Sequence, residues 1–168
     1  MNHLISLAII LLTGLAVYAI LRSGPARPAA PPPRAGSPYI PSLPDTSPVR
    51  HWSDGGRFLV EVSSESRYQG AIGELAGEHG AQGASAPYQA VLLPDDHNHY
   101  EDKAVAVFLA GRMVGYLAPK DALRFRQRLA AAELAGQPTT CDAMVRGGGD
   151  WQGKRLAYVV VLDVEPFE

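Results

Sequence analysis

The sequence predicts a small, mostly β domain with one or two helices, preceded by a single transmembrane helix. Hydrophobic residues are concentrated in one uncharged N-terminal segment, residues 4–21, which only Ser6, Thr13 and Gly14 interrupt, and in short runs after residue 57. The short runs are separated by Gly- and Asp-containing turns, a pattern typical of a small barrel or sandwich built from hairpins. A single cysteine among 168 residues excludes a disulfide framework and a cysteine-based zinc module.

Residues 1–21 are predicted to be a membrane anchor. Residues 4–21 are 18 residues without a charge, about the minimum needed to cross the roughly 30 Å core of a bilayer as a helix. A cleaved signal peptide is the alternative, because Val17-Tyr18-Ala19 loosely resembles a cleavage site. No Lys or Arg precedes the apolar segment, whereas four arginines follow it: Arg22, Arg27, Arg34 and Arg50. This asymmetry favours a retained, single-pass anchor in the inner or cell membrane, with the folded domain in the cytoplasm.

Residues 22–56 are predicted to be a proline-rich linker. Nine of the 14 prolines lie between residues 22 and 50. Proline has no backbone N–H and interrupts helices and central strands, so this stretch is expected to be extended and partly polyproline. The folded domain is therefore expected over residues 57–168.

The two parts of the chain differ in charge. Residues 1–50 carry four Arg and one Asp, a net charge of +3, whereas residues 51–168 carry 11 Lys and Arg against 16 Asp and Glu, a net charge of −5. A domain with this charge cannot hold a polyanion by bulk attraction. Any contact with nucleic acid must therefore come from a local site.

Alternating, β-rich runs predict six strands. They cover residues 57–62, 88–93, 104–109, 113–117, 139–145 and 156–164. Ala110-Gly111 is a tight turn between the third and fourth runs, and Gly147-Gly148-Gly149 lies between the last two, so each pair is expected to form a hairpin. In the third run, Val and Leu alternate with Ala and Phe and so fall on opposite faces.

Two helices complete the predicted domain. The longer covers residues 119–135, with Pro119 in its first turn and Gly136 just beyond its end. Its apolar face is Ala122, Phe125, Leu129 and Ala132, and its opposite, basic side is Lys120, Arg124 and Arg128. The basic side is either a solvated helix face or a phosphate-contact surface. A shorter helix is expected over residues 72–76.

The sequence contains no motif of a serine hydrolase, a nucleotide-binding loop or a zinc protease, and neither catalysis nor a cofactor is expected. The densest polar stretch, residues 94–103, places His97 and His99 among four carboxylates. Histidine and carboxylate side chains are typical ligands of zinc and hard ions. Because alternate residues of a strand share a face, a metal site is one interpretation of this stretch. A solvated polar loop between two strands is the favoured interpretation, and no metal is expected.

Two stretches together resemble a known family. The first is Arg67-Tyr68-Gln69-Gly70, followed by Ile72. The second is the run NHYEDKAVAV from Asn98 to Val107, followed by Gly111, Val114-Gly115-Tyr116-Leu117 and Asp121-Ala122. Over residues 57–164 this spacing resembles the HIRAN domain. That family has Tyr-Gln shortly after its first strand, then Asn-Pro-Tyr-Asp, one variable residue and Asn-Ala-Val, and later Val-Gly-Tyr-Leu with an Ala in the next helix.

The resemblance implies a modified OB-like β-barrel that binds nucleic acid, in well-understood members the 3′ end of single-stranded DNA. By position, Tyr68 and Tyr116 would stack on bases, and Arg67 can stack through its guanidinium plane. Glu101 holds the place of the family aspartate that accepts a hydrogen bond from the terminal hydroxyl. The expected nucleic-acid-binding residues are Arg67, Tyr68, Asn98, Tyr100, Glu101, Lys103, Tyr116, Lys120 and Arg124.

We therefore expect a membrane-tethered, non-catalytic module whose partner is single-stranded nucleic acid, DNA in particular. The alternative on the same fold is a protein-interaction module with a degenerate DNA site. The net charge of −5 favours that alternative, as do His99, Glu101 and Lys103 where the family has Pro, Asp and Asn. A secreted or periplasmic domain is a third possibility, and it requires cleavage of the apolar segment.

Overall fold

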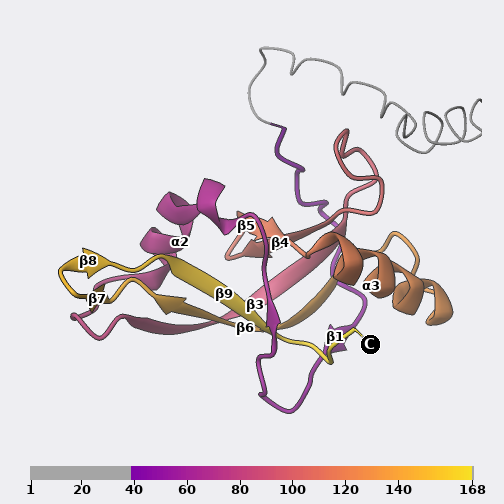
Figure 1. The fold of residues 1–168 in the computed structure, drawn as a ribbon. Coiled ribbons are helices and arrows are strands. Elements are labelled where there is room, and N and C mark those ends of the chain that lie inside the picture. The colour runs from indigo at the N-terminus through magenta and orange to yellow at the C-terminus, as the bar shows by residue number, and fades with distance from the viewer. Residues whose placement is uncertain (1–38, 168) are drawn as a thin grey trace, which may run out of the picture. The chain divides into compact units, whose positions relative to one another are not determined.

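Residues 39–167, which the computed structural model describes, form a curled, half-barrel sheet with two α-helices packed on it (Figure 1). This confirms the predicted mostly β class with one or two helices. Within these residues no helix is long and apolar enough to cross a membrane. The expected anchor, residues 1–21, lies outside the described residues.

The sheet is largely antiparallel, with the strand order β2-β9-β6-β3-β4-β5, and β1 pairs in parallel with β6. Its strands are β1 (His51–Trp52), β2 (Val60–Glu61), β3 (Ala84–Pro94), β4 (Val105–Leu109), β5 (Arg112–Tyr116), β6 (Thr139–Gly147) and β9 (Tyr158–Asp163). Strand β3 has 11 residues and pairs with β6 over its first part and with β4 over its last part. Strand β3 therefore joins the β6 side of the curled sheet to the β4 side.

The two ends of this strand order meet at one bridge. Ser63, which follows β2, donates its N–H to the carbonyl of Tyr116 at 2.7 Å, and the N–H of Tyr116 donates to the carbonyl of Ser63 at 3.0 Å. Tyr116 is the last residue of β5. We call this bridge the seam; it links the first strand in the order to the last.

The strands predicted from residue 88 onward are confirmed, with ends that shift by a few residues. The strand predicted over 57–62 is wrong in length, because only residues 60–61 pair with β9. Phe58 has φ of 51°, a left-handed conformation that a strand cannot contain. The turn predicted at 147–150 is instead the base of a second small hairpin, β7 (Asp150–Trp151) and β8 (Lys154–Arg155).

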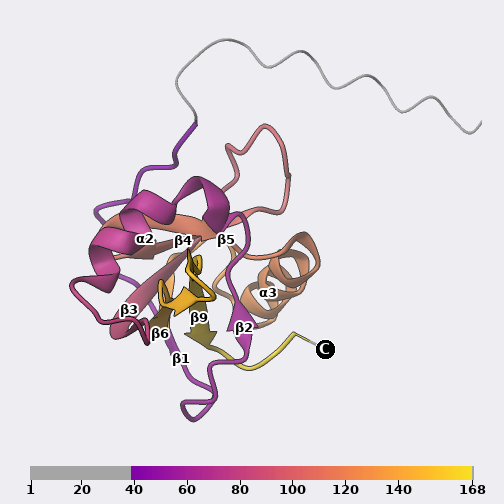
Figure 2. The same cartoon turned by 60° about the vertical axis from the view of Figure 1, so that its left-hand side comes forward.

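Two helices flank the strands in the rotated view of Figure 2: α2 (Gln69–Ala76) and α3 (Pro119–Ala131). A short 3-10 helix, η1 (Glu65–Arg67), leads into α2. Helix α3 begins at the predicted Pro119 but ends before the predicted residue 135. Glu133 has φ of 60°, and the N–H of Leu134 returns to the carbonyl of Leu129 at 2.8 Å, which terminates the helix.

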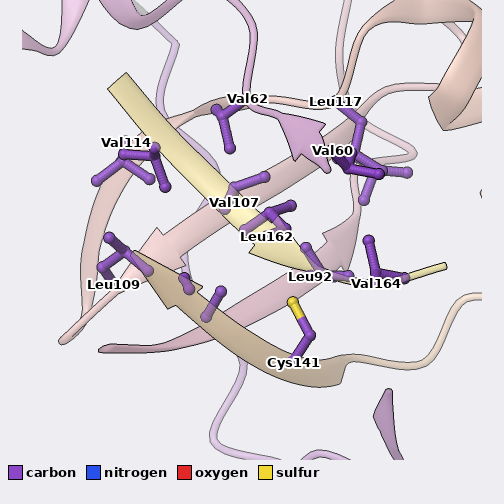
Figure 3. Close-up of a cluster of buried hydrophobic side chains, with 14 of the residues drawn as sticks. Val60, Val62, Leu92, Val107, Leu109, Val114, Leu117, Cys141, Leu162 and Val164 are labelled. Atoms are coloured by element: carbon purple, nitrogen blue, oxygen red, sulfur yellow. The ribbon is translucent and has the colours of Figure 1, made fainter. Parts of the chain in front are cut away.

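The main hydrophobic core fills the inside of the curl. The side chains gathered there in Figure 3 include Val60, Val62, Leu92, Val107, Leu109, Val114, Leu117, Cys141, Leu162 and Val164. The predicted apolar face of α3 contributes Ala122, Phe125 and Leu129, all buried. A second, smaller group of buried residues lies on the other face of β3, β4 and β5: Leu93, Ala106, Phe108 and Met113. We call this group the outer cluster.

Part of the expected linker contacts the sheet. Within residues 39–56, β1 pairs with β6, and the N–H of Val49 donates to the carbonyl of Pro138 at 3.1 Å. The following turn is held by Asp163, which is 2% exposed at the end of β9. Its carboxylate accepts bonds from Ser53 Oγ at 2.7 Å and from the Gly56 N–H at 2.8 Å. Residues 51–56 are therefore fixed by side-chain and backbone bonds to the sheet.

The Asp163 carboxylate should contribute to stability only while it is ionised. Burial alone raises its pKa, but the hydrogen bonds from Ser53, Gly56 and Asp54 outweigh burial and leave the pKa below its usual value of 3.8. A depressed folded-state pKa means that the contribution is complete above the unfolded-state pKa and is lost as the pH falls below it.

We expect Asp163→Asn to lower the free energy of unfolding by about 1–3 kcal/mol at pH 7, because it removes a charged acceptor from a buried site. The difference from the wild type should shrink as the pH is lowered through 3.8 and below. Urea unfolding of the full chain, followed by circular dichroism at pH 7 and pH 3, measures both. Asp150→Asn, at an exposed position of β7, is the control and should change neither. Equal stability of Asp163→Asn and the wild type at pH 7 would contradict this role.

Candidate nucleic-acid interface

Two predicted stacking residues, Tyr68 and Tyr116, lie beside the same apolar surface. Both are partly buried and pack against the outer cluster. Tyr68 stands immediately before α2, where its N–H donates to the Glu65 carbonyl at 2.8 Å and its own carbonyl accepts the Ile72 N–H at 2.9 Å. Tyr116 is fixed by the seam. The structure therefore brings two rings from distant parts of the chain to one place and holds each by its backbone.

A buried carboxylate, Asp95, lies beside the hydroxyl of Tyr116. It follows β3 and is 4% exposed. Its Oδ1 accepts the hydroxyl of Tyr39 at 2.7 Å, and its Oδ2 lies 3.5 Å from the hydroxyl of Tyr116 and 3.4 Å from Nδ2 of Asn98. No ion pair among residues 39–167 involves Asp95. Asp95 is therefore a carboxylate served by hydroxyl and amide donors and not by a cation.

The phenols around Asp95 are donors at neutral pH. Burial, together with the hydrogen bond to Asp95, raises the pKa of Tyr39 to about 12. Burial and the nearby Asp95 also raise the pKa of Tyr116, and burial raises that of Tyr68. All three hydroxyls therefore keep their protons and can donate to an acceptor.

The polar loop after Asp95 is shaped by Asn98. Its Oδ1 accepts the N–H groups of Tyr100 at 2.9 Å and Glu101 at 3.2 Å, which is an Asx-type turn. Tyr100 is 81% exposed, and Glu101 is partly buried with Oε1 3.4 Å from the N–H of Lys103. The predicted residues Asn98, Tyr100, Glu101 and Lys103 thus lie on one loop. Asn98 shapes that loop, and Tyr100 presents its ring to solvent.

Arg126 fixes the far end of this loop. Its guanidinium pairs with Asp96 at 2.6 Å and donates to the carbonyls of Lys103 at 3.1 Å and Ala104 at 2.9 Å. Arg126 and Asp95 are not among the residues predicted to bind nucleic acid, and Asp95 was considered only as one of the carboxylates around His97 and His99. In the sequence, Asp95 follows a predicted strand and Arg126 lies within a predicted helix. A polar residue is ordinary at both positions, so neither residue stands out as functional.

The predicted basic residues differ in what their side chains contact. Arg67, Lys103 and Lys120 are exposed, and within residues 39–167 none of them forms an ion pair. Arg124 donates instead to the carbonyl of Phe167. Arg128 donates to the carbonyl of Glu165 at 3.1 Å. Two of the three residues on the basic side of α3 therefore bind the C-terminal segment.

Among the described residues no group of three or more His, Cys, Asp or Glu side chains is placed to hold a metal ion. His97 and His99 are both exposed. The chain matches no family model, no curated protein and no solved structure. The side chains of the interface offer two tyrosine rings, a buried carboxylate that accepts a hydroxyl, and a polar loop.

Glu65 ties the segment that carries Tyr68 to the sheet. Its Oε1 accepts the N–H of Val160 in β9 at 2.6 Å. Burial raises the pKa of Glu65 to about 7, and the charge of Glu61 adds to the increase, although the Val160 N–H opposes it. A raised folded-state pKa means that the folded state binds a proton more tightly than the unfolded state, so stability falls as the pH rises from 4.5 through 7.

Replacement of Glu65 by Gln should flatten this pH dependence. Between pH 5 and pH 8 we expect the wild type to lose more stability than Glu65→Gln, because the amide does not ionise. Urea unfolding midpoints at half-unit pH intervals provide the comparison. Glu78→Gln, exposed beyond α2, should follow the wild-type curve. Parallel curves for Glu65→Gln and the wild type would show that Glu65 does not titrate in this range.

Proposed function

We propose that the folded domain is a non-catalytic module that binds the 3′ end of single-stranded DNA, and that the N-terminal segment tethers it to the cytoplasmic face of a membrane. The barrel would then be of the modified OB type that the HIRAN resemblance implies. The observation that carries the proposal is that Tyr68 and Tyr116 pack on the same outer cluster and that Tyr116 lies beside the buried Asp95. Anchor and orientation rest on the sequence pattern alone.

The chemistry of a strand end fits these side chains. Exposed bases stack on aromatic rings, and each such contact is worth about 1–3 kcal/mol. A free 3′ end also carries a hydroxyl, which can donate to a carboxylate. Asp95 already accepts a phenolic hydroxyl at 2.7 Å. Arg67, Lys103 and Lys120 are the exposed cations available to phosphates, and Tyr100 offers a further ring and hydroxyl on the loop.

A protein-interaction function on the same surface is the second candidate. It is favoured by the charge of residues 51–168, which is −5, and by the two carboxylates at the interface, Asp95 and Glu101. Both features repel the negatively charged phosphates of a nucleic acid. A peptide needs neither a cationic patch nor a terminal hydroxyl, so the two functions differ in what the surface must recognise.

Titration of the full chain in detergent with fluorescent single strands separates the two functions. One strand ends in a 3′-hydroxyl and the other in a 3′-phosphate. The proposal requires binding at low salt that weakens as salt is added and that favours the hydroxyl end. If neither strand binds at low salt, the protein-interaction function replaces this proposal.

We expect Tyr68→Ala and Tyr116→Ala each to weaken strand binding by about 1–3 kcal/mol, because each removes one stacking surface. Tyr68→Phe and Tyr116→Phe keep the ring face and should retain most of the affinity. Fluorescence anisotropy gives the dissociation constants, and unfolding midpoints confirm that each variant is folded. Trp151→Ala, an exposed aromatic in β7, is the matched control and should bind as the wild type does. Unchanged binding by both alanine variants would contradict the stacking role.

The two carboxylates can be separated by their effect on end preference. Asp95→Asn and Glu101→Gln keep size and remove charge, so the one that accepts the terminal hydroxyl should lose about 1.5–3 kcal/mol of its preference for the 3′-hydroxyl strand over the 3′-phosphate strand. The same variant should bind the 3′-phosphate strand better, because a repulsive charge is gone. Asp102→Asn, exposed on the same loop, should alter neither strand. If both variants keep the wild-type preference, neither carboxylate accepts the terminal hydroxyl.

A further inference from the structure

The candidate interface is in contact with a segment of the chain itself. Residues 39–46 belong to the proline-rich stretch and lie against the outer cluster and the polar loop. Tyr39 donates its hydroxyl to Asp95 at 2.7 Å, and its ring centroid lies 6.0 Å from that of His99 in a tilted arrangement. Leu43 packs on the outer cluster, as do Tyr68 and Tyr116. One segment therefore contacts the carboxylate, the loop and the apolar surface together.

The contacts of Tyr39 have the same chemistry as those expected of a strand end. A base contributes a flat ring, and the terminal sugar contributes a hydroxyl. Tyr39 brings a flat ring to the polar loop and a hydroxyl to Asp95. A ligand hydroxyl that bonds Asp95 Oδ1 would have to take the position that the phenol of Tyr39 now holds.

The segment is held mainly by side chains. Within the described residues, the first backbone–backbone hydrogen bond along the chain is the one from Val49 to Pro138, and residues 39–48 make none. Pro41, Pro44 and Pro48 have no N–H to offer. A segment without backbone bonds can leave the surface at small free-energy cost. The bonds at Val49 and β1 keep it tethered nearby, so its effective concentration at the interface stays high.

We propose that residues 39–46 act as an intramolecular competitor, with Tyr39 as a pseudo-ligand that a single-strand end must displace from Asp95. This inference rests on the proposed function and adds regulation to it. The observed association constant for a strand is then the intrinsic association constant multiplied by the fraction of molecules in which the segment has left the interface. Anything that draws the proline-rich segment away would activate binding.

The test uses the full chain in detergent and a fluorescent oligothymidylate with a 3′-hydroxyl end. Tyr39→Ala removes ring and hydroxyl and should tighten strand binding by about tenfold, since a hydrogen bond to a charged group is lost from the closed state only. Leu43→Ala should also tighten strand binding. Tyr39→Phe removes only the hydroxyl, so its gain in affinity measures the contribution of the hydrogen bond to Asp95. Ile40→Ala is the matched control, because Ile40 neighbours Tyr39 but is 57% exposed, and its affinity should equal that of the wild type.

A peptide covering residues 38–48, added in excess to Tyr39→Ala, should weaken strand binding toward the wild-type value, whereas the same peptide with Ala in place of Tyr39 should have less effect. If the wild type binds the strand and Tyr39→Ala and Leu43→Ala bind it no more tightly, the competitor proposal is overturned and the proposed function stands. If none of the proteins binds the strand, both fall. If Tyr39→Ala binds the labelled peptide but no strand, the segment is the ligand of a peptide-binding surface, and competition with DNA is overturned.

Discussion

The architecture of the interface depends on the close backbone contact at the seam. Ser63 and Tyr116 each donate an N–H to the carbonyl of the other. These two bonds form only if β5 and the end of β2 approach each other without a side chain between them. Gly115 makes this possible. A Cβ at this position would lie 2.4 Å from the Ser63 carbonyl oxygen and 2.5 Å from a Val62 methyl group. Because η1 and α2 follow Ser63 directly, the same contact that links the ends of the sheet also brings Tyr68 to the side of Tyr116.

Two buried aspartates, Asp95 after β3 and Asp163 at the end of β9, differ in the partners that hold them, and this difference separates a structural role from an exchangeable one. Asp163 is bound by two backbone N–H groups and a serine hydroxyl of the turn at residues 53–56, which β1 and β2 hold against the sheet on either side. The shortest hydrogen bond to Asp95, at 2.7 Å, comes from the phenol of Tyr39, and the His97 N–H, the Asn98 side-chain amide and the Tyr116 hydroxyl lie farther away, at 3.3–3.5 Å. A phenol on a segment without backbone bonds can be replaced by another hydroxyl at little cost, whereas a turn amide cannot. Asp95 is therefore the carboxylate suited to ligand exchange.

Much of the fold could be predicted from the sequence because it depends on local patterns. Alternation placed Val107 and Leu109 on one face of β4 and Phe108 on the other, and the structure puts them in the main core and the outer cluster, respectively. Conformations with positive φ at Phe58 and Glu133 were not predictable, because neither residue type favours them and both are imposed by tertiary contacts or helix termination. Strand β2 and helix α3 are shorter than predicted for this reason.

The interface was predictable only in part, for a different physical reason. Tyr68, Asn98 and Tyr116 were predicted from a spacing pattern; the structure packs Tyr68 and Tyr116 on the outer cluster and places Tyr116 and Asn98 beside Asp95. Asp95 was one of four carboxylates in a stretch interpreted as a solvated polar loop, and Tyr39 lay in a stretch that proline content assigned to a linker. Proline density predicts the loss of backbone hydrogen bonds, and residues 39–48 indeed make none. It does not predict side-chain contacts, which can still hold an extended chain on a surface. The same property that made this segment look like a spacer leaves it able to occupy the interface and to leave it.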